Sequence, residues 1–314
     1  MTPDLSIIIV SWNVREMLRE CLASIARYHG VLRVQIIVVD SASTDGSAAM
    51  VRADFPDVLL LAQAENIGFV RGNNLGLEHA TGRYVLLLNP DTRVHAHALG
   101  DMVGYLDAHP EYAILGPHTL NTDGTHQSTR RRFPSLALAL FESTAFQGLA
   151  PRGLLRRFYA QDLPDEGTFP VDWVQGSALL ARRTVYEAIG GLDPAFVMFF
   201  EELDWCKRAA AAGFGAVYLG AAYITHHGGG STAQVSARKH THFQFSKLRY
   251  FRKHHGRPAA WLLRAVIVLS YGLQTLIEGA KLAVGHKRDL RAARIRVYGQ
   301  LLHALTIGGE AREP

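Results

Sequence analysis

The sequence predicts an α/β protein with a mostly parallel, twisted sheet flanked by helices, followed by a helical C-terminal appendage. Two observations predict this class. Short apolar runs alternate with longer amphipathic segments through the N-terminal half, a pattern typical of strands joined by crossover helices. Polar residues directly follow several of the apolar runs, at the position where open α/β sheets bind ligands.

Each expected element follows from its own pattern. Apolar runs rich in β-branched residues predict strands, and periodic segments with one polar face predict helices. The expected strands are 5–10, 34–39, 58–62, 84–88, 112–116, 171–181 and 215–219. The expected helices are 14–28, 44–54, 68–79, 96–109, 184–189 and 201–212. Residues 121–165 are less regular, and we expect them to form an insertion over one edge of the site.

The composition is that of a folded protein in a reducing compartment. With 314 residues, 48% of them hydrophobic and 19% charged, the chain can form one large domain with an appendage. Its two cysteines, Cys21 and Cys206, supply neither a disulfide framework nor a zinc set. We expect both to be core residues, and we expect no secretory signal peptide before the first strand.

The net charge of +5 is unevenly distributed. From residue 238 onward there are 15 Lys and Arg against 4 Asp and Glu, a net charge of +11, which leaves −6 on the remainder. We therefore expect a domain at 1–240 and a basic, partly apolar helical tail at 241–314. The charge-free run Ala265–Ile277 has 13 residues, fewer than the roughly 20 that span a bilayer. An interfacial or packed helix is favoured over a membrane-spanning one, and the basic charge indicates an anionic membrane surface as the partner.

Two early strands end in polar residues. Ser11 and Asn13 follow the first strand, and Asp40 closes the second, so their side chains meet at one sheet edge. Asp40 can accept hydrogen bonds from a base or ribose, whereas Asp45 is better explained as a helix cap. Neither a G-x-G-x-x-G nor a P-loop motif is present, which disfavours dinucleotide-binding and P-loop proteins.

A second polar segment, residues 66–74, combines two glycines with three asparagines at a helix start. Gly68 permits close backbone approach, and the amides of Asn66 and Asn73 can read the edge of a nucleobase. A glycine-rich turn with helix capping explains the same residues.

The run Val85–Leu88 ends abruptly in Asn89-Pro90-Asp91. A carboxylate at this position can hold a divalent cation against a diphosphate. An ordinary turn has the same sequence, so Asp91 gains weight only if another ligand converges on it. His226, beside the glycines 228–230, is the candidate.

Three carboxylates follow an apolar run at 196–200: Glu201, Glu202 and Asp204. Acidic residues favour the first turn of any helix. Beside aromatic residues, however, a carboxylate is partly desolvated, and its basicity rises toward that of a general base.

Taken in order, these motifs resemble the family 2 glycosyltransferases, over roughly residues 5–231. The resemblance is to the branch with an Asn-Pro-Asp metal motif, which includes bacterial rhamnosyltransferases of cell-surface polysaccharide synthesis. It implies a GT-A fold and inverting transfer from a nucleotide-sugar, with L-rhamnose or a related deoxyhexose from a dTDP-sugar as the expected donor. The implied acceptor is a lipid-linked or cell-surface glycan at the cytoplasmic face of the membrane.

The resemblance also implies roles. Asp91 and His226 would hold Mg²⁺ or Mn²⁺, and Glu202 would be the catalytic base, with Glu201 and Asp204 as neighbours. The implied acceptor wall contains Trp173, Gln175 and Gly176. The implied donor-binding residues are Ser11, Asn13, Asp40, Asn66, Gly68, Arg71, Asn73, Asn89 and Asp91. Two positions depart from the family pattern. Asn89 stands where many relatives have Asp, and Glu202 is longer than the usual Asp, which leaves Glu201 and Asp204 as alternative bases.

Three alternatives stay open. A UDP-hexose donor keeps the family and changes the sugar. A sugar nucleotidyltransferase would release pyrophosphate, but its glycine-rich signature is absent near the first strand. Aromatic residues at 243–251 alternate with basic ones and could stack bases, yet residues 261–284 are too apolar for a nucleic-acid-binding arm. We therefore expect no nucleic-acid partner.

Overall fold

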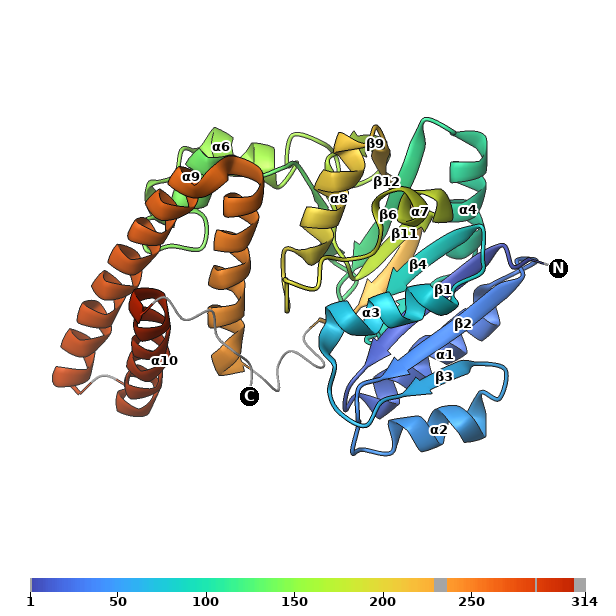
Figure 1. Cartoon of the computed structure of the whole chain (residues 1–314), viewed down its shortest axis with the longest axis horizontal. Coiled ribbons are helices and arrows are strands. Elements are labelled where there is room, and N and C mark those ends of the chain that lie inside the picture. Colours follow the sequence, from blue (N-terminus) through green and yellow to red (C-terminus); the bar gives the residue numbers. More distant parts are fainter. Residues whose placement is uncertain (1, 229–235, 286, 308–314) are drawn as a thin grey trace. The chain divides into compact units, whose positions relative to one another are not determined.

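The structure, a computed structural model, describes residues 2–228, 236–285 and 287–307. The chain divides into two compact units (Figure 1). The first comprises Met1–Phe133 and Tyr159–Gln234, and the second comprises Pro134–Phe158 and Val235–Pro314. Residues 134–158 therefore group with the C-terminal helices, an association that the sequence pattern does not predict.

A sheet of ten strands forms the centre of the first unit. Its order is β3-β2-β1-β4-β11-β6-β12-β5, with β7 beside β6 and β9 beside β12. The strands are β1 Leu5–Ser11, β2 Val34–Asp40, β3 Leu59–Ala62, β4 Tyr84–Leu88, β5 Thr92–Val94, β6 Tyr112–Leu120, β7 His126–Gln127, β9 Thr168–Val171, β11 Ala178–Arg182 and β12 Gly215–His226. A separate pair joins β8, Arg130–Arg131, to β10, Trp173–Val174.

The central strands have the expected direction. β1 runs parallel to β2 and β4, and β2 runs parallel to β3. β11 lies antiparallel between β4 and β6, and β6 is parallel to β12. The predicted α/β class is confirmed, and its parallel strands end at one common edge.

Helices cover both faces of this sheet. They are α1 Arg15–Tyr28, α2 Ser47–Asp54, α3 Gly68–His79, α4 Ala98–Ala108, α7 Arg183–Ile189 and α8 Glu201–Ala211. Alternation along β1 sends Ile7 and Ile9 into the core cluster that includes Leu18 and Leu22 of α1. Ile8, on the other face, contacts α3.

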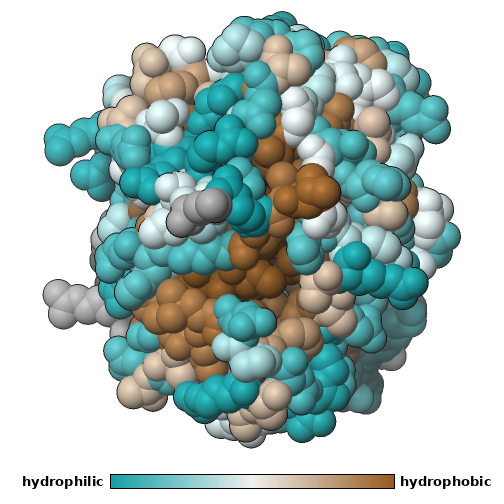
Figure 2. Space-filling view, turned by 90° about the vertical axis from the view of Figure 1, so that its right-hand side faces the viewer, coloured by the Kyte–Doolittle hydropathy of each residue, from teal (hydrophilic) through white to brown (hydrophobic). Residues whose placement is uncertain are grey.

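The buried core of the first unit is formed by apolar residues of the predicted strands and helices. Cys21 and Cys206 are both free and buried, as expected from the sequence, and burial raises the pKa of each thiol to about 12. Figure 2 shows an apolar region bordered by hydrophilic residues on one face of the molecule. Single exposed apolar residues such as Val31 and Leu59 are ordinary in soluble domains.

The largest difference from the predicted elements concerns residues 171–181, which we expected to form one strand. They contribute instead to β9, β10 and β11. The interruption lies at Gln175 and Gly176, where the backbone N–H of Gln175 donates to the carbonyl of Thr129 rather than to the main sheet. An apolar run does not reveal such a change of partner.

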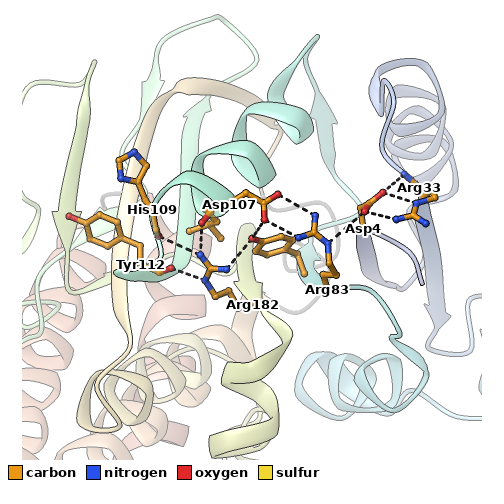
Figure 3. Close-up of polar contacts among 9 residues, drawn as sticks. Asp4, Arg33, Arg83, Asp107, His109, Tyr112 and Arg182 are labelled. Atoms are coloured by element: carbon orange, nitrogen blue, oxygen red, sulfur yellow. Dashed lines mark hydrogen bonds and ion pairs between the residues drawn. The ribbon is translucent and has the colours of Figure 1, made fainter. Parts of the chain in front are cut away.

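The amino ends of the strands are tied by a polar network (Figure 3). Arg182 donates to the carbonyl of Tyr112 at 3.0 Å and to the hydroxyl of Tyr84 at 3.1 Å. Arg83 pairs with Asp107 at 2.9 Å, and Arg33 lowers the pKa of Asp4 to about 2 by hydrogen bonding. The side chains at the amino edge of the sheet therefore stabilise the fold, and ligands are expected at the opposite, carboxyl edge.

The second unit is helical. Its elements are α5 Leu136–Phe141, the 3₁₀ turn η1 Gln147–Leu149, α6 Arg152–Phe158, α9 Ser236–Ala283 and α10 Arg288–Ile307. α9 is interrupted at Gly256, whose φ is 87°, two residues before Pro258. α10 and α5 both pack on α9. Within the described residues, one helix segment, His240–Ala283, is long and apolar enough to cross a membrane by length and composition alone.

Candidate active site

The first part of the site lies where β1 and β2 end side by side. Ser11 is the register partner of Asp40, and both are buried. One carboxylate oxygen of Asp40 accepts from the backbone N–H of Ser43 at 3.0 Å. The other, Oδ1, and the hydroxyl of Ser11 have no hydrogen-bond partner in the described part of the chain. Buried polar atoms rarely stay unpaired, so this edge can accept hydrogen bonds from a ligand.

The loops after β1 and β2 hold each other. Asn13, at a φ of 52°, donates its backbone N–H to the hydroxyl of Ser43 at 3.0 Å, and its side-chain oxygen accepts from the N–H of Thr44 at 2.8 Å. Asp45 accepts from the N–H groups of Arg15 and Ser47, the first residues of α1 and α2. The capping interpretation of Asp45 therefore agrees with the structure.

At the start of α3, the predicted donor-binding residues make local contacts. Asn66 accepts from the N–H of Gly68 at 2.9 Å, and Gly68 has the left-handed φ of 74° that favours glycine. Asn73 is buried and donates to the carbonyl of Phe69 at 2.9 Å, whereas Arg71 is exposed. These contacts fix the helix start, and base reading by these residues stays a prediction.

The turn Asn89-Pro90-Asp91 leads from β4 into β5, and β5 brings in the histidine. β5 pairs antiparallel with β12 so that Thr92 faces His226, and the N–H of His227 donates to the carbonyl of Asp91 at 2.9 Å. The carboxylate Oδ1 of buried Asp91 consequently lies 3.3 Å from Nε2 of His226. The two predicted metal ligands converge. Residues 229–231 of the predicted glycine loop lie outside the described residues.

The orientation of His226 is set by Gln127 on β7. The Gln127 side-chain oxygen lies 2.7 Å from Nδ1 of His226, and the Gln127 amide nitrogen donates to the side-chain oxygen of Asn121 at 2.8 Å. Because the oxygen of Gln127 can only accept, Nδ1 carries a proton. In the neutral ring the lone pair is then on Nε2, the nitrogen nearer Asp91. Asn89, whose amide nitrogen is 3.3 Å from Nε2, is compatible with this tautomer.

This donor set fits a divalent cation. One carboxylate oxygen and one imidazole nitrogen are ligands for Mn²⁺ or Mg²⁺ when substrate phosphates and water complete the coordination. The Gln127 contact is the kind of outer hydrogen bond that fixes a metal-binding histidine. Within the described residues no group of three or more His, Cys, Asp and Glu side chains gathers, so protein ligands alone do not complete a metal site there.

The carboxylate pair begins α8. Phe199 and Phe200, which precede it, both have φ near 66°, a left-handed conformation that costs a bulky residue about 1–3 kcal/mol. Such strain persists where the surroundings force a geometry. Here it places Glu201 and Glu202 together at the N-terminal end of the helix.

Burial raises the pKa of both glutamates. For Glu201, burial and the charge of Glu202 raise the pKa well above its usual range. For Glu202, burial is again the main cause, and it is opposed by the backbone N–H groups of Glu202, Gly176 and Leu203 and by the charge of Arg131. Each glutamate has one buried oxygen, Oε2, that finds no partner among the described residues.

The predicted acceptor segment contacts this pair. A Cβ on Gly176 would lie 3.6 Å from Cβ of Glu202, in ordinary van der Waals contact, so Gly176 lies directly beside this side chain. Trp173 is buried and donates its indole N–H to the carbonyl of Arg132 at 3.1 Å. The neighbouring Ser177 carbonyl accepts from the N–H of Asn89. Gly176 and Ser177 therefore connect the Asn-Pro-Asp turn to α8.

Asp204, the third candidate carboxylate, has a different environment. It is fully buried and pairs with Arg208 at 3.0 Å. Arg208 also donates to the carbonyls of Ile189 and Gly191 at 2.7 Å. The pair secures the turn that precedes α8.

Sequence reasoning missed Gln127, Arg208 and the role of Asn74. Asn74 donates to and accepts from the backbone of Leu192 at 2.8 Å, which anchors the same turn to α3. Gln127 lies on a strand of two residues inside a segment expected to be an insertion, and no local pattern marks it. Arg208 lies four residues after Asp204, and this spacing on a helix was the available signal.

Polar strand ends, a carboxylate–histidine pair and a buried pair of glutamates lie on one α/β sheet, and the family match identifies the class of enzyme. The sequence matches the model of glycosyl transferase family 2 over residues 6–189, more than half the chain. The protein belongs to this family and is a glycosyltransferase.

Similar proteins are consistent with that class. The chain is 26% identical over 284 residues to the N-acetylglucosaminyl-diphospho-decaprenol L-rhamnosyltransferase of Mycobacterium tuberculosis, covering 86% of this chain and 92% of that protein. It is 24% identical over 168 residues to the rhamnosyltransferase WbbL of Escherichia coli, covering 51% and 61%.

A solved structure shares the fold. It is the mannosyltransferase PcManGT from Pyrobaculum calidifontis in complex with GDP-Man and Mn²⁺, with a TM-score of 0.52 and 18% identity, covering 96% of this chain and 88% of that one. The expected GT-A fold is confirmed.

Proposed function

We propose that this enzyme transfers a deoxyhexose, L-rhamnose in the first instance, from a dTDP-sugar to a hydroxyl of a lipid-linked or cell-surface glycan. The observation that carries the proposal is the 3.3 Å pairing of Asp91 with His226, on the same sheet edge as the unpaired oxygen of Asp40. The similarity to two rhamnosyltransferases supports the choice of sugar.

The donor half of the mechanism uses the strand ends. Asp40 accepts hydrogen bonds from the base or ribose, with Ser11, Asn13, Asn66, Gly68, Arg71, Asn73 and Asn89 around the nucleotide. Asp91 and His226 would hold Mg²⁺ or Mn²⁺ on the diphosphate. When bound, the cation supplies Lewis-acid stabilisation of the negative charge that develops on the leaving group. In the neutral ring of His226, the proton that Gln127 holds on Nδ1 leaves Nε2 available as a ligand.

The acceptor half uses α8. Glu202 removes the proton from the acceptor hydroxyl while that oxygen attacks the anomeric carbon from the side opposite the diphosphate, so the configuration inverts. Burial makes its carboxylate a stronger base than an exposed glutamate. Trp173, Gln175 and Gly176 form the adjoining wall. Burial and the charge of Glu202 raise the pKa of Glu201, which favours its protonated form, and Asp204 pairs with Arg208, so we assign the base to Glu202.

The membrane is part of the proposal. A lipid-linked acceptor and a net charge of +11 from residue 238 onward favour peripheral binding to the anionic cytoplasmic face of the cell membrane. The tail, residues 241–314, would carry this contact, and the domain at 1–240 would carry the chemistry.

Thermal-shift measurements test the donor. We would compare dTDP, UDP, GDP and CDP, each with and without Mn²⁺, on the wild-type chain and on Asp91→Ala. A nucleotide at 100 times its Kd stabilises the fold by roughly 2.7 kcal/mol, so the expected result is a Mn²⁺-dependent shift with dTDP that Asp91→Ala loses. A shift with UDP alone would replace the proposed donor with a UDP-hexose.

Product analysis tests the reaction. Incubation with dTDP-rhamnose and an acceptor lipid should release dTDP and form a glycosylated lipid. Release of pyrophosphate from a sugar phosphate and a nucleoside triphosphate would instead mean nucleotidyl transfer and would overturn the proposal.

A further inference from the structure

The geometry of the second unit points to a defined membrane-docking surface. We propose that the outward face of α9 from Trp261 to Ala280, called here the docking face, lies in the interfacial plane of an anionic lipid bilayer. The inference rests on the proposed function only for its biological setting, a lipid-linked acceptor. Its physical basis is the exposure and charge of α9 and α10.

The docking face is apolar and exposed. Trp261, Leu269 and Leu276 are exposed by 67%, 63% and 73%. The other exposed members are Leu262, Ala265, Leu273, Ile277 and Ala280. Spacings of seven, four and three residues between Leu262, Leu269, Leu273 and Leu276 put these leucines on one side of the helix. Twenty helical residues extend about 30 Å, so the docking face is a continuous apolar surface and not a set of isolated exposed leucines.

The charges of this helix point the other way. Glu278 is buried and accepts from Arg291 of α10 at 2.7 Å. Arg264 donates to the carbonyl of Leu305 on α10. The sequence shows charges interrupting the apolar run at both positions, and the structure turns both toward α10. The inward side also buries Leu263, Ile267 and Tyr271, so α9 is apolar on both sides, whereas a soluble surface helix has a polar outer side.

Exposed cations border the docking face at both ends. Arg252 and Arg257 precede it, and Lys287 and Arg288 follow it. Basic residues near a bilayer surface each gain about 1 kcal/mol from anionic lipids, and tryptophan prefers the membrane–water interface. An apolar strip between cationic ends therefore matches an anionic bilayer better than a second copy of the chain, whose own strip would bring like charges together.

The helix lies on the bilayer in this proposal and does not cross it. α10 packs along α9 and exposes Arg288, Arg294 and Arg296. A crossing α9 would carry these arginines toward the hydrocarbon, which is costly. A helix in the interfacial plane leaves them in water or among lipid headgroups.

Vesicle co-sedimentation of the full chain tests the surface. The probes are phosphatidylcholine vesicles with and without phosphatidylglycerol, at low and high salt. The test variant is Leu269→Ser with Leu276→Ser. The matched control is Val31→Ser, which changes a fully exposed apolar residue (100%) of the first unit. Since all three residues are exposed, melting temperatures should not change, and this is measured first.

We expect the wild type and Val31→Ser to bind anionic vesicles at low salt and to dissociate at high salt. The affinity of the double variant for vesicles should be lower by about tenfold or more, because the apolar transfer free energy of both leucines is lost. Equal binding by the double variant overturns the proposal. Resistance of the bound protein to extraction at high salt and alkaline pH would indicate a spanning helix and would also overturn the proposal. The same holds if the wild type does not bind vesicles but forms a dimer that the double variant loses.

A separate measurement distinguishes failure of the proposed function from failure of the docking face. The thermal shift with dTDP and Mn²⁺ is measured on the same protein without vesicles. Vesicle binding without a nucleotide shift leaves the docking face intact and removes the donor assignment, whereas the opposite result removes the docking face alone.

Discussion

In the proposed mechanism, two adjacent glutamates with different environments supply the acid–base chemistry. Glu201 is the more buried, and its pKa is raised well above the usual range by burial and by Glu202. The raised pKa of Glu201 favours its protonated form, in which it exerts no like-charge repulsion on Glu202, the proposed base. Pairs of titratable groups with separated pKa values commonly divide acid and base roles in this way.

Replacing the two glutamates one at a time should separate their roles. Glu202→Gln should lower kcat by roughly 10²–10⁴-fold, because glutamine cannot accept the acceptor proton, while nucleotide affinity stays unchanged. Glu201→Gln imitates a neutral carboxyl and should keep most of the activity. Steady-state kinetics with a nucleotide-binding titration measure both, and the reverse ordering of the two variants would assign the base to Glu201.

The activity should depend on pH through Glu202. Since the base must be ionised and burial raises its pKa, kcat/KM should rise with pH through a midpoint above the ordinary glutamate value of about 4.3.

The free energy of unfolding should change with pH in the opposite direction. A folded-state pKa raised above the unfolded one makes the free energy of unfolding decrease as pH rises between the two values. Glu201→Gln should flatten that decrease, as denaturation at several pH values would show.

Gln127 is expected to matter for cation affinity without touching the cation. Gln127→Leu removes the acceptor that holds the proton on Nδ1 of His226 and should weaken Mn²⁺ binding in the presence of dTDP by about 10–100-fold. Gln127→Glu keeps an acceptor and should bind nearly as well as the wild type. Calorimetric titration with Mn²⁺ gives the affinities, and unchanged affinity in Gln127→Leu would exclude the orienting role.

At the scale of elements, the position of α3 depends on two glycines. A Cβ on Gly76 would lie 2.4 Å from a side-chain carbon of Ile8, and one on Gly72 would lie 2.8 Å from Val10. The absence of Cβ atoms at Gly72 and Gly76 is what lets α3 lie this close to β1. The helix that begins at Gly68 is thereby held against the strand that ends at Ser11.

Gly76→Ala should therefore destabilise the protein by about 1–3 kcal/mol, the cost of overpacking a close contact. Gly100→Ala is the matched control, because it lies in helix α4 with nothing within 4 Å of its Cβ position. It should be neutral or stabilise by up to about 1 kcal/mol. Chemical denaturation of both variants measures the difference, and equal stabilities would show that α3 can shift without cost.

The sequence predicts the long elements well and the short ones poorly. The parallel strands and their helices follow from apolar periodicity, because each buries a continuous face. β5, β7 and β8 have two or three residues, too few for a period, and their places are set by long-range pairing. Asp91 was identifiable because a proline stops its strand, whereas Gln127 acts across 99 residues and leaves no local signal.

At the scale of the whole molecule, the second unit is not only a tail. Residues 134–158 precede the last third of the first unit in the chain yet group with residues 235–314. α5 packs on α9 and buries Leu138 and Ala139. A boundary drawn from composition at residue 240 separates these partners, because composition does not report contacts between distant segments.

A chain ended after residue 240 should consequently be compromised. It keeps α5 but loses the helix that covers Leu138 and Ala139, so apolar surface is exposed to water. We expect a lower melting temperature, increased binding of a hydrophobic dye and aggregation relative to a chain that ends after residue 307. A truncated protein as stable and as monodisperse as the longer one would show that α5 needs no cover.

The pairing of β5 with β12 also limits when Asp91 and His226 can meet during synthesis. β5 emerges from the ribosome at residues 92–94, but its one neighbour in the sheet order, β12, ends at residue 226. A nascent chain of 189 residues contains the whole stretch matched by the family and still lacks His226. A chain that ends before residue 226 therefore cannot assemble the pair of Asp91 and His226, and the non-local pairing that brings them together is slow to form.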